Sequence, residues 1–266
     1  FPIRAVDPDQ AELNLARYLA LEKEIGEEPQ NRFKIKAHLP FPWMWDIIRN
    51  KNILDSVEDI IGPDILCWGS SFFTKNAHDT RFVSWHQDAT YWGLSKPDVV
   101  TAWIALSPAT VESGCMKVVP GSHKWSQVAH RDTLNEHNLL TRGQELAVDV
   151  DEDTAIYMPL QPGEVSLHHV LMAHASTANT THDRRVGFAI RYVRPDVSQE
   201  KAEKDSAWLV RGEDRFGNFI HETPPEGDMD EAALAEHHRI LKLRQGVLYD
   251  GVQGKPAHIS DLGAAE

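Results

Sequence analysis

The amino-acid sequence predicts a mainly β fold with flanking helices, on the basis of three observations. Residues 65–193 form short β-branched and aromatic runs separated by Gly, Pro and Asp turns, a pattern typical of an all-β sandwich or barrel. Apolar residues recur at helical spacing before and after this segment. A chain of 266 residues can bury one large core. We therefore predict a single domain over 1–266, with a helical part at 1–64, a β core at 65–193 and an appendage of loops and helix at 194–266.

Two helices are predicted in the N-terminal part. Residues 9–25 are good helix formers and carry an apolar stripe that includes Tyr18 and Leu19. Residues 53–61 repeat apolar side chains at helical spacing, and Asn52 is the expected N-cap.

Four predicted strands of the β core carry the residues of interest, at 72–75, 82–85, 164–170 and 185–192.

The polar segment 128–144 interrupts the strand pattern. A long insertion of this kind is more often a functional rim or lid than a core element.

The C-terminal part is predicted as loop followed by helix. A polar stretch after Pro195 leads to the short apolar run 208–212 and then to a loop rich in Pro and Asp. Asp228 or Asp230 would cap a last helix that ends near Leu243.

Composition argues against two classes of binding partner, nucleic acids and membranes. A formal net charge of −13 argues against nucleic acid, which needs a basic surface. No apolar run approaches the roughly 20 residues that span a bilayer, so no membrane partner is expected. The two cysteines, Cys67 and Cys115, offer no disulfide framework, and a reducing cytoplasm is the expected location. A small-molecule substrate is the partner that remains.

The most informative motif is Trp85-His86-Gln87-Asp88, taken together with the distant His174. Two histidines and one carboxylate are the ligands of non-haem iron(II) oxygenases, and they leave open positions on one face of the metal. If the strand continues through the motif, His86 and Asp88 share a face because side chains at i and i+2 do so. The chain has 14 histidines, so this pair alone is weak evidence, and the flanking segments decide its weight.

Those flanking segments follow one another in a definite order. They are His86-Gln87-Asp88, residues 101–106, 114–116, 120–123, 163–164 and 174–179, and Arg185. The ordered series resembles the phytanoyl-CoA dioxygenase family of iron(II)/2-oxoglutarate oxygenases over about residues 66–192. Two positions depart from the family pattern: Ala175 stands where Gly is usual, and Glu164 where Asp is common. Neither is a metal ligand in that pattern.

The resemblance implies a double-stranded β-helix core, related to jelly rolls and cupins. It implies that Fe(II) is held by His86, Asp88 and His174, with 2-oxoglutarate and O2 as co-substrates. It further implies that Arg185 pairs with the distal carboxylate of 2-oxoglutarate, and that Ser176 and Trp103 make further contacts. The implied reaction is hydroxylation of a C–H bond in a small organic substrate, with release of succinate and CO2.

Neighbouring side chains that compete for these roles are interpreted as structural. Strand alternation places Arg184 and Arg185 on opposite faces, so only one of them can point at the iron, and the resemblance selects Arg185. We interpret Arg184 and Arg191 as surface charge. The family spacing selects His174 as the ligand in preference to His168.

The segment after Asp88 bears on the substrate. Residues 89–94 are similar to segments of bacterial family members that act on small polar metabolites, among them 2-aminoethylphosphonate hydroxylases. Tyr91 and Trp92 could form the wall of a compact pocket that suits an ammonium group. An anionic group of the substrate, carboxylate or phosphonate, could be met by Lys75, Arg142 or Arg211. In the alternative, both aromatic residues only pack under the lid, and Lys75 is a solvated strand end.

Three other functions compete with this one. The first is a non-catalytic binding protein that keeps its metal site by descent, and the intact set of ligands and Arg185 argues against it. The second is a cupin-type metal enzyme that does not use 2-oxoglutarate. The third is a halogenase, which is disfavoured because Asp88 fills the position that halogenases leave open for chloride.

Overall fold

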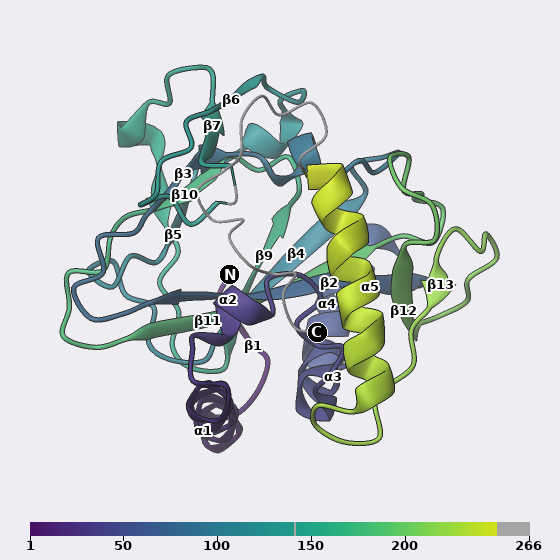
Figure 1. Ribbon diagram of the computed structural model, residues 1–266. Coiled ribbons are helices and arrows are strands. Elements are labelled where there is room, and N and C mark those ends of the chain that lie inside the picture. The colour runs from purple at the N-terminus through teal and green to yellow at the C-terminus, as the bar shows by residue number, and fades with distance from the viewer. Residues whose placement is uncertain (141, 249–266) are drawn as a thin grey trace.

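Two mainly antiparallel sheets enclose one cavity in the computed structural model, which describes residues 1–140 and 142–248 (Figure 1). The larger sheet has seven strands in the order β1-β9-β4-β11-β2-β12-β13, and the smaller has four in the order β3-β10-β5-β8. β6 and β7 pair as a separate two-stranded sheet. The predicted mainly β fold with flanking helices and a double-stranded β-helix core is confirmed.

The strands are β1 (Ile3–Arg4), β2 (Ile65–Lys75), β3 (Val83–His86), β4 (Val99–Ala105), β5 (Met116–Val118), β6 (His130–Asp132), β7 (Gln144–Leu146), β8 (Ile156–Tyr157), β9 (Glu164–His169), β10 (His174–Ser176), β11 (Arg185–Val193), β12 (Ser206–Arg211) and β13 (Ile220–His221). The α-helices are α1 (Pro8–Ile25), α2 (Pro29–Arg32), α3 (Pro42–Ile48), α4 (Lys51–Ile61) and α5 (Glu231–Leu248). Three short 3-10 helices are η1 (Asp88–Tyr91), η2 (Ser122–Lys124) and η3 (Glu152–Thr154).

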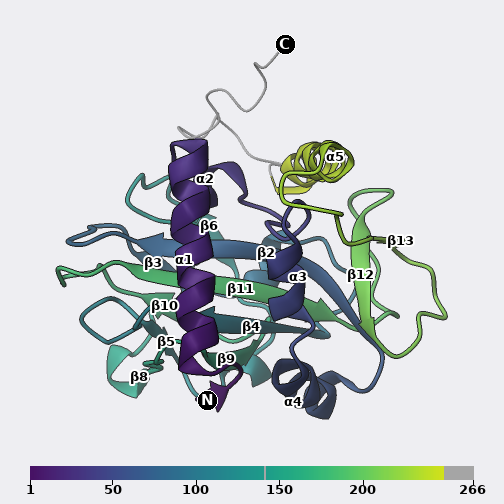
Figure 2. The same cartoon turned by 90° about the horizontal axis from the view of Figure 1, so that it is seen from below.

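The N-terminal helices cover the outer face of the larger sheet, and the smaller sheet lies on its other side (Figures 1 and 2). The main hydrophobic core lies between this helical layer and the sheet, and it joins residues of α1, α3 and α4 to strand residues such as Phe72 and Phe188. The side chains of β11 point alternately to the two faces of the larger sheet. Phe188 and Ile190 belong to the helix-side core, whereas Arg185 and Arg191 line the cavity between the sheets.

The structure corrects two details of the predicted helices. In α1 the buried face includes Asn14 and Tyr18, and Leu19 is 44% exposed. α4 is capped by Asn50, whose side chain accepts hydrogen bonds from the backbone N–H groups of Asn52 and Ile53. The Asn52 side chain instead donates to backbone carbonyls of the N-terminal segment. The first difference arises because tertiary packing, not helical periodicity alone, selects the buried face, and the second because Asn50 reaches the free N–H groups of the first turn.

The inserted segment 128–144 contributes to a rim above the β core. β6 and β7 form its two-stranded sheet. The amide of Asn138 donates to the hydroxyl of Ser84 over 2.8 Å, which ties the segment to β3.

The C-terminal appendage ends in α5, which crosses in front of the larger sheet in Figure 1. Asp230 caps this helix, since its carboxylate accepts a hydrogen bond from the N–H of Ala233 over 3.0 Å. None of the helices in the described ranges is both long and apolar enough to cross a membrane.

Candidate metal centre

Three side chains converge in the cavity between the two sheets. One ligand atom from each of His86, Asp88 and His174 can be chosen so that all lie within 4.8 Å of one another. His86 ends β3 and pairs with His174 of β10 across the smaller sheet. The expectation that Asp88 lies on the same strand as His86 is wrong, because Asp88 begins η1. The turn nevertheless brings the carboxylate to 3.4 Å from Nε2 of His86.

The hydrogen bonds of the two imidazoles orient them for metal binding. Nδ1 of His86 lies 2.9 Å from the carbonyl of Ser84, and Nδ1 of His174 lies 2.9 Å from the carbonyl of Met172. A carbonyl can only accept, so each Nδ1 carries the proton. Each Nε2 therefore keeps a free lone pair, which is the usual arrangement around a metal-bound histidine.

The electrostatics of His174 and Asp88 favour their metal-binding protonation states. Burial, followed by the neighbouring His86, lowers the pKa of His174 well below its ordinary value. Burial alone would raise the pKa of Asp88, but the neighbouring His86, His174 and Arg191 outweigh it and hold that pKa well below its ordinary range. Neutral imidazoles and an ionised carboxylate are what a divalent cation requires.

Arg185, the first residue of β11, lines the same cavity. Its guanidinium is buried, donates to the backbone carbonyl of Gly114, and lies 5.4 Å from the ring centre of Trp103. Within the described ranges, Arg185 forms no ion pair and its Nε has no hydrogen-bond partner. Burial lowers its pKa to about 10, so it stays charged at neutral pH. A buried cation without a carboxylate partner is suited to bind an anion.

Trp103, Ser176 and Lys75 surround Arg185. Trp103 and Ser176 line the cavity, while Lys75 is fully buried and donates to the hydroxyl of Ser176 over 2.7 Å. The reading of Lys75 as a solvated strand end is therefore wrong, and its ammonium lies at the Arg185 end of the cavity. Burial, followed by the charge of Arg185, lowers the pKa of Lys75 to about 6.

Gly187 allows this close packing. A Cβ built on it would lie 1.9 Å from the ring of Trp103, so any side chain there would displace the tryptophan.

The two competing arginines are placed differently from each other. Arg184 points away from the cavity and pairs with the carboxylate of Glu22, as its surface interpretation predicts. The same interpretation of Arg191 is wrong, because Arg191 lines the cavity. Strand alternation could have predicted this, because residues 185 and 191 are an even number of positions apart and so share a face of the strand.

His168 is a second cavity residue that the sequence interpretation left without a role. Its Nε2 lies 3.9 Å from the Asp88 carboxylate, and its Nδ1 has no hydrogen-bond partner in the part of the chain that is described. Burial lowers the pKa of His168 to about 4, so the ring is neutral.

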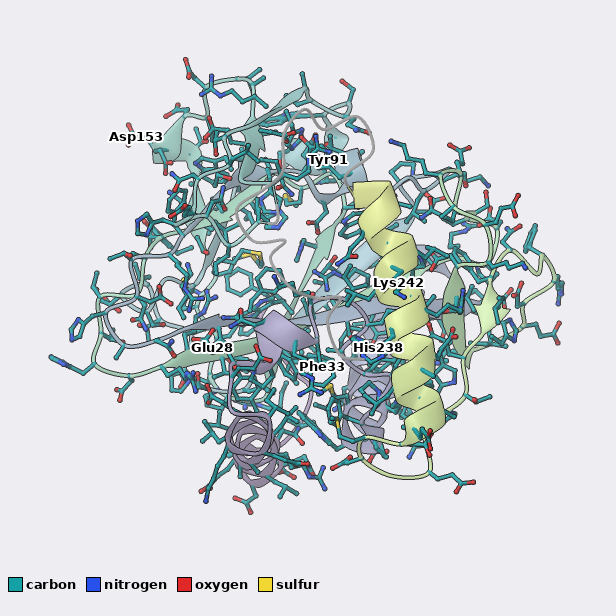
Figure 3. All side chains as sticks on the ribbon, in the orientation of Figure 1. Glu28, Phe33, Tyr91, Asp153, His238 and Lys242 are labelled. Carbon is teal, nitrogen blue, oxygen red and sulfur yellow. The ribbon has the colours of Figure 1, made fainter. Side chains whose placement is uncertain are left out.

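The candidate substrate residues divide into three groups. Tyr91 and Trp92 line an outer chamber next to the metal cavity, together with Trp68, Arg244 and Val247. Figure 3 shows Tyr91 beside the C-terminal end of α5.

Arg142 pairs with Asp132 and lies over the Tyr91 ring at 4.3 Å, so it supports the chamber wall. Arg211 pairs with Asp55 and Glu58 and lines neither the cavity nor the outer chamber, so it is not placed to contact a substrate there.

Comparison with known proteins links the chain to one family. Residues 16–187 match the family model described as Phytanoyl-CoA dioxygenase (PhyH). A probable alpha-ketoglutarate-dependent hypophosphite dioxygenase of Stutzerimonas stutzeri is 27% identical over 74% of this chain and 66% of its own length. An ectoine dioxygenase of Sphingopyxis alaskensis is 26% identical over 75% of this chain and 72% of its own length.

A solved structure covers more of the chain. The apo form of the non-heme monooxygenase ThoJ is 36% identical, covers 94% of each chain and superposes with a TM-score of 0.82. A nickel complex of ThoJ is also known and superposes with a TM-score of 0.78. The first curated relatives are matched over a smaller part of their own length, between 46% and 66%.

Proposed function

Because the chain belongs to the phytanoyl-CoA dioxygenase family of iron(II)/2-oxoglutarate oxygenases, we propose that it is a dioxygenase that hydroxylates a C–H bond of a small organic molecule and releases succinate and CO2. One observation carries this proposal. Two histidines and a carboxylate face the same cavity as a buried arginine that has no carboxylate partner among the described residues.

His86, Asp88 and His174 would hold the Fe(II). The donor set fits that ion, because two imidazole nitrogens and one carboxylate are its usual ligands in enzymes that activate dioxygen. When bound, the metal supplies open coordination positions at which 2-oxoglutarate and dioxygen react. The protein's own contribution is orientation: the Ser84 and Met172 carbonyls fix the two rings, and the sheets exclude water.

Arg185 would bind the distal carboxylate of 2-oxoglutarate. The planar guanidinium can pair with a carboxylate through two parallel hydrogen bonds. Ser176 and Trp103 would contact the same molecule, one as a hydroxyl and one as a wall. Lys75 lies behind Ser176, and a carboxylate bound at Arg185 would raise its pKa and favour its charged form, so we assign it to the co-substrate end and not to the primary substrate.

The proposed primary substrate is small and either zwitterionic or anionic, for example an aminophosphonate. Two relatives are named for hypophosphite and ectoine, both small polar molecules. Tyr91 and Trp92 provide aromatic walls of the outer chamber, and aromatic faces attract ammonium groups. A fold and metal site of this kind accept many substrates, so the family name does not identify this one.

A screen for succinate release tests the proposal. The Fe(II)-loaded protein would be supplied with 2-oxoglutarate, O2 and single members of a panel of aminophosphonates, amino acids, betaines and long-chain acyl-coenzyme A thioesters. We expect succinate release to be stimulated by a small zwitterion or anion. Stimulation by acyl-coenzyme A alone would contradict the substrate class. Absence of succinate under all conditions would favour a non-catalytic protein or a metal enzyme that does not use 2-oxoglutarate.

The same reaction distinguishes a hydroxylase from a halogenase. Asp88 occupies the coordination position that a halide would need, so the product formed in excess chloride should carry added oxygen only. Mass spectrometry of that product decides the question, and a chlorinated product would contradict the assigned role of Asp88.

A further inference from the structure

Two arginines of β11 face the same cavity. Arg185 and Arg191 lie on one face of the strand, six residues apart, which is about 20 Å along an extended chain. Arg185 occupies the closed end, among backbone carbonyls and Trp103. A single 2-oxoglutarate chelated at the metal can present its distal carboxylate at one end only. The proposed co-substrate therefore leaves Arg191 without a ligand.

The surroundings of Arg191 leave its charge unbalanced. Its Nη1 donates to the hydroxyl of Ser71 and, over 3.3 Å, to the carbonyl of Ala189. Among the described residues, no carboxylate lies within ion-pair distance of it, and its other guanidinium nitrogens have no hydrogen-bond partner. Asp88 is the acidic group that most affects it, and the metal would take up that charge. A largely buried cation in such surroundings gains most from an external anion.

Arg191 also lies where the metal cavity meets the outer chamber. Phe73, Asp88 and Arg191 line both spaces. The guanidinium carbon is 5.7 Å from the ring centre of Phe73 and 5.8 Å from that of Trp92, so aromatic faces flank it. A molecule that enters through the outer chamber must pass this residue before it reaches the metal.

The other buried cations of the outer chamber are already neutralised. Lys36 pairs with the buried carboxylate of Glu222, and Arg244 pairs with Asp205 over 3.1 Å. These two cations therefore already form ion pairs within the protein. Lys34, half-buried as Arg191 is, also lines this chamber and forms no ion pair among the described residues, but of the two only Arg191 also lines the metal cavity. Arg191 is therefore the cation placed to bind an anionic group close to the metal.

We propose that Arg191 binds the anionic group of the primary substrate, a carboxylate or a phosphonate, and so determines which C–H bond faces the metal. The proposal rests on the proposed dioxygenase function and adds a specific residue and contact to the substrate class. Two parallel hydrogen bonds from a guanidinium would fix both the position and the rotation of such a group.

Binding measurements test this without turnover. The Ni(II)-loaded protein with 2-oxoglutarate would be titrated with 2-aminoethylphosphonate and its diethyl ester, and with β-alanine and its amide. The ester and the amide keep the ammonium group but lack the anionic group. Calorimetry, supported by tryptophan fluorescence because Trp92 is close to Arg191, would report binding. The variants are Arg191→Gln and Arg191→Lys, and Arg211→Gln is the matched control outside the chamber.

We expect Arg191→Gln to weaken the binding of each acid at least tenfold and that of its ester or amide less than threefold, because only the acid has an anionic group to pair with the guanidinium. Arg191→Lys should recover part of the loss, since an ammonium keeps the charge but not the paired geometry. Affinities for Ni(II) and 2-oxoglutarate should change less than threefold in both variants, and Arg211→Gln should behave as the wild type.

Three results would overturn the proposal. The first is equal weakening of the acid and of its ester or amide, the second is a fall in 2-oxoglutarate affinity as large as the fall in acid affinity, and the third is failure of both acids to bind the wild-type protein. Failure of the proposed function is a separate result, because it would show as absence of succinate from the Fe(II)-loaded protein whatever these titrations give.

Discussion

The two ends of β11 present an arginine to one cavity, but they are built from different parts of the chain. At the Arg185 end the neighbours are Trp103, Ser176 and Lys75, all on strands of the β core. Gly187 allows tight packing there, and backbone carbonyls accept the guanidinium hydrogens. This end is rigid and closed.

At the Arg191 end, residues from outside the two sheets join the strand residues Ser71 and Phe73. Trp92 follows the short helix η1, and Arg244 belongs to the C-terminal helix α5. If the proposed function is correct, the β core holds the co-substrate and supplies Arg191, whereas loops and the C-terminal appendage supply the remaining walls around the substrate. Those outer segments can vary without disturbing the sheets.

The largest expected effect comes from His174, because a metal ligand matters for binding at both ends of the cavity. His174→Ala removes one of the three proposed ligands, so metal binding and succinate formation should be lost while the fold persists. Metal content, succinate release and circular dichroism measure these three properties. His182→Ala, at an exposed histidine that contacts only His78 in the described residues, is the control. Full iron affinity and turnover in His174→Ala would refute the ligand assignment.

The next effect concerns the closed end alone. Arg185→Ala removes a buried charge-assisted pair, for which about 2 kcal/mol of binding is expected, so the affinity for 2-oxoglutarate should fall by well over tenfold. Arg184→Ala should change that affinity little, because its partner is Glu22 on the opposite side of the sheet. Calorimetric titration of both variants decides the matter, and the reverse outcome would show that the two arginines exchange roles.

A pair of glycine variants tests whether the two ends differ in packing. Gly187→Ala forces the Trp103 ring to move, and overpacking of this kind costs about 1–3 kcal/mol of unfolding free energy. Gly69→Ala is the matched change near the outer chamber, where a Cβ meets nothing within 4 Å. Urea unfolding of both variants should show a clear loss for Gly187→Ala only. Equal losses would mean that the closed end is not the more tightly packed one.

The smallest predicted effect is a pH dependence at the closed end. The pKa of Lys75 is about 6 in the free protein, and a carboxylate bound at Arg185 would raise it. Between pH 6 and that raised pKa, the complex then holds more protons than the free protein, so 2-oxoglutarate affinity should fall as pH rises, by at most about tenfold per pH unit.

Titrations at several pH values measure this slope. Lys75→Met should abolish it, whereas Lys96→Met, at an exposed lysine paired with Asp196, should leave it unchanged. An unchanged slope in Lys75→Met would assign the proton to another group.

Local sequence pattern by itself determined the classes of secondary structure, the order of the segments that carry His86, Asp88 and His174, and the opposite facing of Arg184 and Arg185. These features repeat over a few residues, so they can be read without knowing which segments meet. Asp88 shows the limit of this reasoning, because strand alternation predicted the right meeting of side chains from the wrong backbone conformation.

Only the tertiary structure decided which charged side chains are buried. Lys75, Arg191 and Arg211 all stand in or near strands, and sequence analysis treated the first and last as possible substrate contacts and the second as surface charge. In the structure Lys75 is sealed behind Ser176, Arg191 is covered by the Trp92 segment, and Arg211 pairs with α4 at the surface. Whether a charge is buried depends on what packs over the strand, and those covering segments lie far away along the chain.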